Sequence, residues 1–303
     1  MTKWLGLVLL VILQFGLPIC LNAQNTDDDV ISVDSAIVVM NAAVTDASGK
    51  GVRGLNPKLF HIFEDGQEQE IKTFEAEETP FAAVILLDTS GSMEQRVTLA
   101  RSAAIQFLDG MRADDFTAIY KFDSKIVQLQ DFSNSRDISD HVYEIKADGM
   151  TVLNDAVFKA AELLSKRPEK RRAIIVLSDG ADTMSKATAE KALRAALLAN
   201  ASIYSVDMSA LDTGGKERMQ TQSILKNFAE KTGGRFVATS GGIAMRDAFK
   251  RIVEELGGQY TIAYQPTNTN KDGKWRAIEL RISRPNLTIR TRKGYNAPNV
   301  KSR

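Results

Sequence analysis

The middle of the chain alternates continuous apolar runs with segments whose apolar residues recur at helical spacing. Residues 81–88 (FAAVILLD) and 173–178 (AIIVLS) are apolar throughout, which is typical of strands buried on both faces of a parallel sheet. Further strands are expected at residues 116–122, 126–132, 202–206 and 236–238, and helices at 97–111, 136–146, 153–165, 186–199, 217–231 and 243–256. This order of strands and helices predicts an α/β fold with a doubly wound, mostly parallel sheet, as in Rossmann-like proteins.

Both ends of the chain have the alternation typical of half-buried strands. Strands are expected at residues 32–44, 59–63, 69–74, 259–264, 275–282 and 287–292, with Asp65-Gly66 as a hairpin turn. Three strands cannot easily form a stable sheet alone, so we expect the two flanks to pair into one small β-sandwich-like domain. We expect residues 24–80 and 258–296 to form this β-domain. Residues 81–257 would form the inserted α/β domain, and residues 297–303 a tail.

Residues 1–23 have the layout of a secretory signal peptide. Lys3 precedes an apolar run over residues 4–15, Pro18 interrupts it, and small Ala23 marks the expected cleavage site. One alternative is an uncleaved signal anchor. Another is a lipoprotein signal at Cys20, although Ile19 stands where such signals carry a small residue. We expect an exported protein, either periplasmic, secreted or at the cell surface, with no membrane span after signal cleavage.

Charge and side-chain chemistry exclude several functional classes. Without residues 1–23 the chain has 38 basic and 38 acidic side chains, so it lacks the positive field of nucleic-acid-binding proteins. Cys20 is the only cysteine, which leaves the mature chain without a disulfide, a thiol nucleophile or a thiolate zinc site. The only histidines are His61 and His141, and both are expected to be surface or packing residues. No catalytic residue is predicted, and the chain is not expected to be an enzyme.

Oxygen-bearing residues gather in three segments that the predicted sheet would bring together. Residues 88–92 (DTSGS) follow one buried strand, residues 178–180 (SDG) end another, and residues 148–151 (DGMT) precede a helix. Ligands of open α/β sheets bind beyond the carboxyl ends of the strands. The candidate ligands are Asp88, Ser90, Ser92, Thr151 and Asp179. Two carboxylates and three hydroxyls suit Mg²⁺ or Mn²⁺, or Ca²⁺ at longer distances.

These residues match a known motif. DTSGS at 88–92, Thr151 within GMTVLNDA and Asp179 within LSDG resemble the metal-ion-dependent adhesion site of von Willebrand factor type A domains. The resemblance covers about residues 81–256, and all five motif positions are filled. The flanks, VTDASGKGVRGLNPKLFHIFEDGQEQEIKTF and KWRAIELRI…LTIRTRKGY, resemble a bacterial group of exported type A-related proteins described from acidobacteria.

The resemblance implies roles for the five residues. Ser90 and Ser92 would bind the cation directly, and Thr151 would do so in the high-affinity state. Asp88 and Asp179 would orient water or bind directly. The open coordination position would take an Asp or Glu carboxylate of a partner protein. The expected function is therefore metal-dependent protein binding of the cell-adhesion type.

Two other functions keep the same cation. The chain could be a scaffold subunit of an envelope complex whose metal is purely structural. A metal-dependent hydrolase is less well supported, because no histidine lies near the three segments. Asp155 has two possible roles, capping of the helix at 153–165 and support of Thr151. The basic run at residues 166–172 (KRPEKRR) is expected to be a solvated loop.

Overall fold

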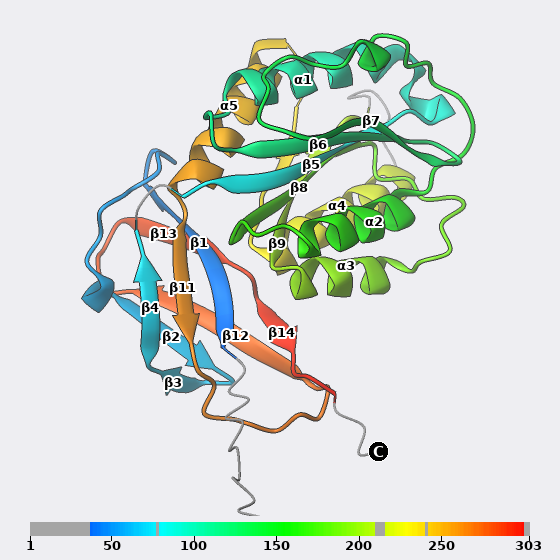
Figure 1. The fold of residues 1–303 in the computed structure, drawn as a ribbon. Helices are drawn as coiled ribbons and strands as arrows, with labels where there is room; N and C mark the ends of the chain where they lie inside the picture. Colours follow the sequence, from blue (N-terminus) through cyan, green and yellow to red (C-terminus); the bar gives the residue numbers. More distant parts are fainter. Residues whose placement is uncertain (1–36, 77–78, 210–215, 240–241, 300–303) are drawn as a thin grey trace, which may run out of the picture. The chain divides into compact units, whose positions relative to one another are not determined.

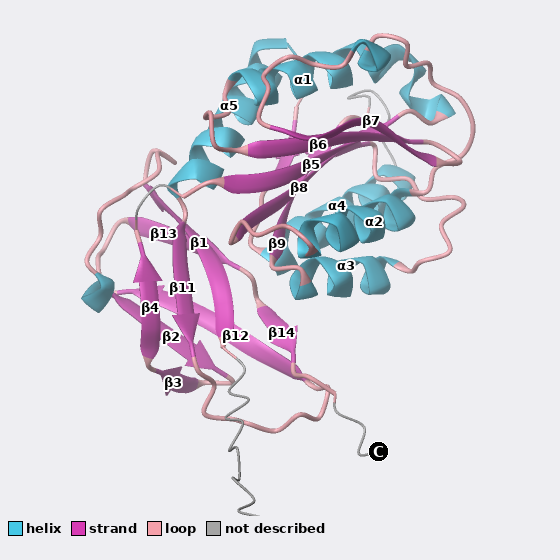
Figure 2. Cartoon of the chain, in the orientation of Figure 1, coloured by secondary structure: helices cyan, strands magenta, loops and turns pink. Residues whose placement is uncertain are grey.

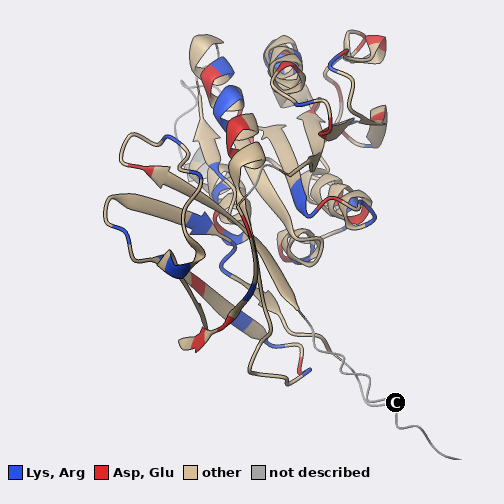
Figure 3. Cartoon of the chain, turned by 60° about the vertical axis from the view of Figure 1, so that its left-hand side comes forward, with Lys and Arg blue, Asp and Glu red and all other residues tan. Residues whose placement is uncertain are grey.

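The computed structural model describes residues 37–76, 79–209, 216–239 and 242–299. The predicted signal peptide and the acidic residues after it lie outside these ranges. In the described ranges, no helix is both long and apolar enough to cross a membrane. Figure 3 shows that the positions of Lys and Arg and those of Asp and Glu are interspersed along the ribbon, in agreement with the balanced charge of the sequence.

A six-stranded sheet forms the α/β part, in the order β10-β9-β8-β5-β6-β7 (Figure 1). All neighbouring strands are parallel except β6 and β7, which form an antiparallel hairpin at one edge. The strands are β5 (Phe81–Asp88), β6 (Phe116–Phe122), β7 (Ile126–Ser133), β8 (Arg171–Ser178), β9 (Ala201–Asp207) and β10 (Phe236–Ala238). The doubly wound sheet is therefore confirmed.

Helices cover both faces of this sheet. Helices α1 (Val97–Asp109) and α5 (Gly242–Gly258) pack on one face, and α2 (Leu153–Ser165), α3 (Ala189–Leu198) and α4 (Lys216–Thr232) on the other. Alternate residues of β5 enter the two cores, with Ile85 facing α1 and α5 and Val84 facing the other three. Burial from both sides explains why β5 and β8 are continuous apolar runs.

The flanks form two four-stranded antiparallel sheets, β13-β1-β11-β4 and β14-β12-β2-β3 (Figure 2). Each sheet takes strands from both ends of the chain, so the predicted pairing of the flanks is confirmed. The strands are β1 (Val38–Asp46), β2 (Phe60–Glu64), β3 (Gln67–Gln69), β4 (Ile71–Glu75), β11 (Tyr260–Tyr264), β12 (Trp275–Ile282), β13 (Leu287–Thr291) and β14 (Gly294–Asn296). One apolar core joins the sheets, with Met40 and Ile262 from one and Ile62 and Ile278 from the other.

The Asp65-Gly66 turn joins β2 and β3 as expected. Both residues have positive φ, 48° and 85°, which is the backbone that a tight hairpin requires and that Asp-Gly adopts at low cost. Residues 69–74 do not form one strand, however. The chain leaves β3 at Gln69 and enters β4 at Ile71, so the two halves pair in different sheets. The predicted strand at 287–292 likewise continues into β14, which belongs to the other sheet.

The predicted helix at residues 136–146 is wrong. This segment has only a short 3-10 turn, η3 (Asp140–Val142). Arg101 of α1 donates to the carbonyl oxygens of Val142 and Tyr143, and Val142 is buried in the core beneath α1. Tertiary contacts therefore hold the backbone in an irregular path, because they use carbonyl groups that a helix would have bonded internally.

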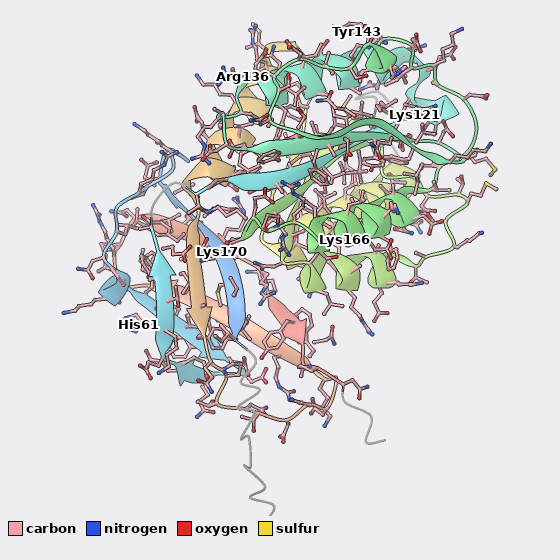
Figure 4. All side chains as sticks on the ribbon, in the orientation of Figure 1. His61, Lys121, Arg136, Tyr143, Lys166 and Lys170 are labelled. Atoms are coloured by element: carbon pink, nitrogen blue, oxygen red, sulfur yellow. The ribbon has the colours of Figure 1, made fainter. Side chains whose placement is uncertain are left out.

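The basic run at residues 166–172 is a solvated loop only in part. Lys170, labelled in Figure 4, is exposed, but Arg171 is fully buried at the start of β8. Its guanidinium donates to the carbonyl oxygens of Gly257 (3.0 Å) and Thr79 (3.5 Å) and to Thr261 Oγ1 (3.4 Å). Thr79 precedes β5 and Gly257 lies at the end of α5. Arg171 therefore contacts both segments in which the chain passes between the β-domain and the α/β domain, at Thr79 and at Gly257.

A buried ion-pair cluster makes a second tie between the domains. Glu255 of α5 pairs with Arg290 of β13 and with Arg235, and it accepts a hydrogen bond from Tyr204 Oη of β9 at 2.7 Å. Burial alone would raise the pKa of Glu255, but the two guanidinium groups hold that pKa below its ordinary value. The carboxylate therefore stays ionised and keeps α5 attached to β13.

Replacement of Arg171 by methionine is expected to lower the free energy of unfolding by about 2–3 kcal/mol, because it removes the buried donor to the carbonyl oxygen of Gly257. The matched control is Lys170→Met, which removes an exposed ion pair with Glu75 and should change stability by less than about 1 kcal/mol. Urea unfolding followed by circular dichroism measures both. Equal effects of the two substitutions would contradict the role given to Arg171.

Candidate functional site

The predicted site lies where the strand order of the six-stranded sheet reverses. The chain runs outward from β5 through β6 and β7 on one side, and from β8 through β9 and β10 on the other. Strands β5 and β8 are adjacent and parallel, so their carboxyl ends, Asp88 and Ser178, reach the same edge of the sheet. This is the position at which open α/β sheets bind ligands.

Asp88 is fully buried and fixed by three hydrogen bonds. Its Oδ1 accepts from the backbone N–H of Ser90 at 2.9 Å and from Ser90 Oγ at 2.6 Å, and its Oδ2 accepts from Ser178 Oγ at 2.6 Å. Burial raises the pKa of Asp88 to about 6, and the negative charge of Asp179 contributes to this rise. The hydrogen bonds from Ser178 and Ser90 act in the opposite direction.

The two serines of the motif lie side by side. Ser90 Oγ is 3.2 Å from Ser92 Oγ, and Ser90 is buried whereas Ser92 is exposed at the start of η2 (Gly91–Arg96). The backbone N–H of Gly91 donates to the carbonyl oxygen of Gly149 at 3.1 Å. This bond joins the loop after β5 to the segment that leads to Thr151.

Thr151 is buried and held through its backbone. Its carbonyl oxygen accepts from the N–H groups of Thr183 and Met184, both at 3.0 Å, and its own N–H donates to Thr183 Oγ1. The structure therefore brings Asp88, Ser90 and Ser92 into direct hydrogen-bond contact. It connects Thr151 to them through the loop backbone.

Asp179 lies just beyond β8, half-buried, and its Oδ1 accepts from the N–H of Ala181 at 3.0 Å. Gly180 follows with a φ of +85°, and a side chain at this position would meet the carbonyl oxygen of Thr221 at 2.6 Å. Only glycine fits this turn, because both the positive φ and the close approach exclude a Cβ. The LSDG sequence thereby turns the chain so that α4 can pack closely behind Asp179.

Asp155 does not bond the N–H groups of its own helix. Its carboxylate accepts from the N–H groups of Lys186 and Ala187, at 2.9 and 2.8 Å. It thus anchors the segment that contains Thr183 and Met184, which in turn hold Thr151. Support of Thr151 by Asp155, through this segment, stays a prediction.

Several residues that position the site were not singled out in the sequence. Asp182 accepts from the N–H of Asn154 at 2.7 Å and from that of Ser185 at 3.1 Å, so it closes the first turn of α2 from another loop. Ser178 holds Asp88, as described above. A run of small polar residues after LSDG, in ADTMS at 181–185, is the signal that could have pointed to this loop.

A cation fits the charges of the site. Within the described ranges, neither Asp88 nor Asp179 has an ion-pair partner, and the like charge of Asp179 adds to the rise in the pKa of Asp88 that burial causes. In the described part of the chain, no group of three or more His, Cys, Asp and Glu side chains is placed so that it could hold a metal ion. A metal here would therefore need the hydroxyls of Ser90, Ser92 and Thr151 besides the two carboxylates, an oxygen set typical of Mg²⁺.

The histidines lie elsewhere. His61, labelled in Figure 4, is on β2, where its ring bonds Glu68 of β3 at 2.9 Å. His141 is an exposed residue of η3, 3.6 Å from Glu144. Neither is among the residues that bond to the predicted site.

Comparisons with known proteins identify the α/β part. Residues 83–181 match the family model of the von Willebrand factor type A domain. Inter-alpha-trypsin inhibitor heavy chain H3 of Bos taurus is 28% identical over 126 residues. That match covers 37% of this chain, and the chain spans about a seventh (14%) of the length of this curated relative.

Two solved structures of bacterial proteins are similar to this chain. The von Willebrand factor type A protein from Catenulispora acidiphila matches with a TM-score of 0.49 and 13% identity, over 88% of this chain and 74% of that one. The pilus adhesin SpaC from Lactobacillus rhamnosus GG, in its open conformation, matches with a TM-score of 0.49 and 10% identity, over 82% and 49%. Residues 83–181 of this chain thus match the von Willebrand factor type A domain, and they lie within the doubly wound α/β part described above.

Proposed function

We propose that this type A domain binds a partner protein through a divalent cation held by Asp88, Ser90, Ser92, Thr151 and Asp179. One observation carries the proposal. Burial, with a smaller contribution from the charge of Asp179, raises the pKa of Asp88, and neither carboxylate has a basic partner among the described residues. They stand beside two hydroxyls that are 3.2 Å apart, at the point where the strand order reverses.

The hydrogen bonds of Asp88 prepare Ser90 to bind a cation. Ser90 Oγ donates its proton to Asp88 Oδ1, so the lone pairs of this hydroxyl are free to face a metal. Asp88 thereby acts through Ser90 as well as by its own charge. Mg²⁺ or Mn²⁺ suits this set of oxygens, and Ca²⁺ suits it at longer distances.

The neutral ligands favour an acidic partner. Ser90, Ser92 and Thr151 carry no charge, so most of the positive charge of the cation would have to be balanced by oxygen atoms from elsewhere. An Asp or Glu carboxylate of a partner protein would supply that charge at the open position. The proposal is for binding, and we assign no catalytic residue.

The rim of the site adds apolar contact surface. Met150 precedes Thr151 and is 51% exposed, and Met184, whose N–H holds the carbonyl oxygen of Thr151, is 54% exposed. Methionine side chains are flexible and polarisable, and they adapt to differently shaped partners. We expect the acidic residue of the partner to be flanked by apolar side chains.

The location is proposed from the sequence. Residues 1–23 have the layout of a signal peptide, so we propose that the domain acts outside the cytoplasm, in the periplasm, in the medium or on the cell surface. A carboxylate-bearing partner in that compartment would meet the site directly. A scaffold with a purely structural metal would keep its partner after chelation, whereas the proposed interaction would be lost.

Mg²⁺ and Mn²⁺ are expected to bind the metal-stripped protein saturably, at one site, in isothermal titration calorimetry. Ser90→Ala/Ser92→Ala should weaken binding by about 100-fold or more, because it removes two ligands that are already in place. The matched control is Ser102→Ala, which removes an exposed hydroxyl of α1 that bonds only the carbonyl oxygen of Thr98. Equal metal affinity of the double variant and the control would contradict the assignment of the site.

Asp88→Asn is expected to stabilise the metal-free protein at neutral pH while it abolishes metal binding. Asp88 has a folded pKa of about 6 against an ordinary value of 3.8, so the folded protein holds a proton that the unfolded chain has released between these values. The stability of the wild-type protein should therefore fall as pH rises from about 4 to 6, by about 2–3 kcal/mol.

The measurement is urea unfolding of both proteins in EDTA from pH 4 to pH 8. Asparagine cannot ionise, so the variant should lack this part of the decline and be the more stable protein at pH 7. Parallel pH profiles for the two proteins would show that Asp88 ionises normally in the fold.

A further inference from the structure

A buried arginine without a counter-ion lies outside the proposed metal site. Arg292 follows β13 and is only 9% exposed. Its Nη1 donates to the carbonyl oxygen of Leu197 in α3 at 3.4 Å, and its guanidinium carbon lies 5.6 Å from the ring centre of Tyr295. Its Nε is buried and has no hydrogen-bond partner.

No carboxylate neutralises this charge in the described part of the chain. Arg292 forms no ion pair within 4 Å, and burial lowers its pKa. The buried acid Glu64 is connected to Arg292 only through tyrosines, because its Oε2 accepts from Tyr264 Oη (2.6 Å) and from Tyr295 Oη (2.9 Å), whose ring lies beside Arg292. Buried cations in proteins are normally paired, because removal from water costs several kcal/mol per ion. An unpaired guanidinium at this depth therefore points to an anion that the described residues do not supply.

Arg292 lines a groove that an anion could enter. The groove has a volume of about 310 Å³, and its walls include Ile37, Leu198 and Tyr295 besides Arg292. Ile37 is 61% exposed and Leu198 is 73% exposed, so apolar side chains stand open to solvent beside the buried cation. Arg194 at the same groove is exposed and pairs with Glu190.

Water does not replace the missing anion. A void of about 10 Å³ also touches Arg292, between α3 and the start of β9. A space of this size holds at most one water molecule. A neutral water molecule would in any case leave the positive charge without a counter-ion.

We propose that this groove binds a small aliphatic carboxylate, with its carboxylate on Arg292 and its hydrocarbon chain against Ile37 and Leu198. The volume is at the lower end of that of small-molecule pockets, about 300–1,000 Å³. An apolar groove with one deep cation matches a ligand that is apolar along its length and anionic at one end.

The groove and the proposed metal site are at opposite edges of the six-stranded sheet. Arg292 contacts Leu197 near the carboxyl end of α3, and β9 starts at Ala201 directly after that helix, so this is the amino-terminal edge of the strands. Asp88 and Ser178 lie at the carboxyl-terminal edge. The carboxylate site is thus independent of the metal site, and either proposal can fail alone.

Octanoate is the probe, titrated into the full chain by isothermal titration calorimetry in EDTA. We expect saturable binding, weakened at least 10-fold for octan-1-ol, which keeps the chain but lacks the charge. Arg292→Met should weaken octanoate binding by about 10- to 100-fold, while octan-1-ol binding should change little.

A second variant covers the case in which Arg292→Met does not fold. Leu198→Glu places a negative charge on an exposed position of the groove and should weaken octanoate binding at least 10-fold. Its matched control is Val127→Glu, an exposed position on β7 away from the groove, which should leave binding unchanged. Absence of saturable octanoate binding would overturn the proposal. Equal binding of octanoate and octan-1-ol, or equal effects of Leu198→Glu and Val127→Glu, would also overturn it.

Discussion

Asp88 is a buried carboxylate with no basic side chain as partner among the described residues, and the architecture of the site follows from this constraint. It lies at the end of the central strand β5, where helices cover both faces and water does not reach. Ser90 and Ser178 supply hydrogen bonds that hold it in place, but they do not cancel the cost of ionisation. A buried, ionised carboxylate lowers the stability of the protein when no ligand is bound. Such a loss is typical of sites that bind a ligand of opposite charge.

The surrounding loops fix the geometry around this carboxylate. Gly91 bonds the loop that leads to Thr151, and Asp155 anchors the segment whose N–H groups hold the carbonyl oxygen of Thr151. Farther away, Arg171 and Glu255 attach the α/β domain to the β-domain at both chain crossings. Helix α5 ends at this attachment and continues into β11. The inserted domain is therefore held by buried polar contacts besides the two covalent connections.

The sequence predicted most of the fold because its strongest signals are local. The apolar runs of β5 and β8, the helical spacing of α2 and the Asp-Gly turn each depend on a few adjacent residues. The secondary-structure predictions that were wrong share one cause, because tertiary contacts decide the local structure there. Arg101 donates to a carbonyl group that a helix at 136–146 would bond internally. At Glu70 the chain passes from one sheet to the other, and the pairing of β4 there depends on residues of β11 almost 200 positions away.

The candidate site was predictable to a similar extent. The positions of Asp88, Ser90 and Ser92 follow from a motif directly after a buried strand, and the structure brings them together. The contacts of Ser178, Asp182 and Thr183 depend on how two loops meet, which no local pattern specifies. Arg171 was assigned to a solvated loop because its run is basic, whereas its burial depends on acceptors far away in the sequence, the carbonyl oxygens of Thr79 and Gly257 and the hydroxyl of Thr261.

The most direct test of this account is a crystal structure of the protein grown with Mn²⁺ and measured at a wavelength where manganese scatters anomalously. The account predicts one strong anomalous peak, within about 2.0–2.4 Å of Ser90 Oγ and Ser92 Oγ and next to Asp88 and Asp179. It further predicts that an oxygen from solvent, acetate or a neighbouring acidic side chain completes the coordination. A well-ordered site without a peak, or with manganese bound only elsewhere on the surface, would contradict it.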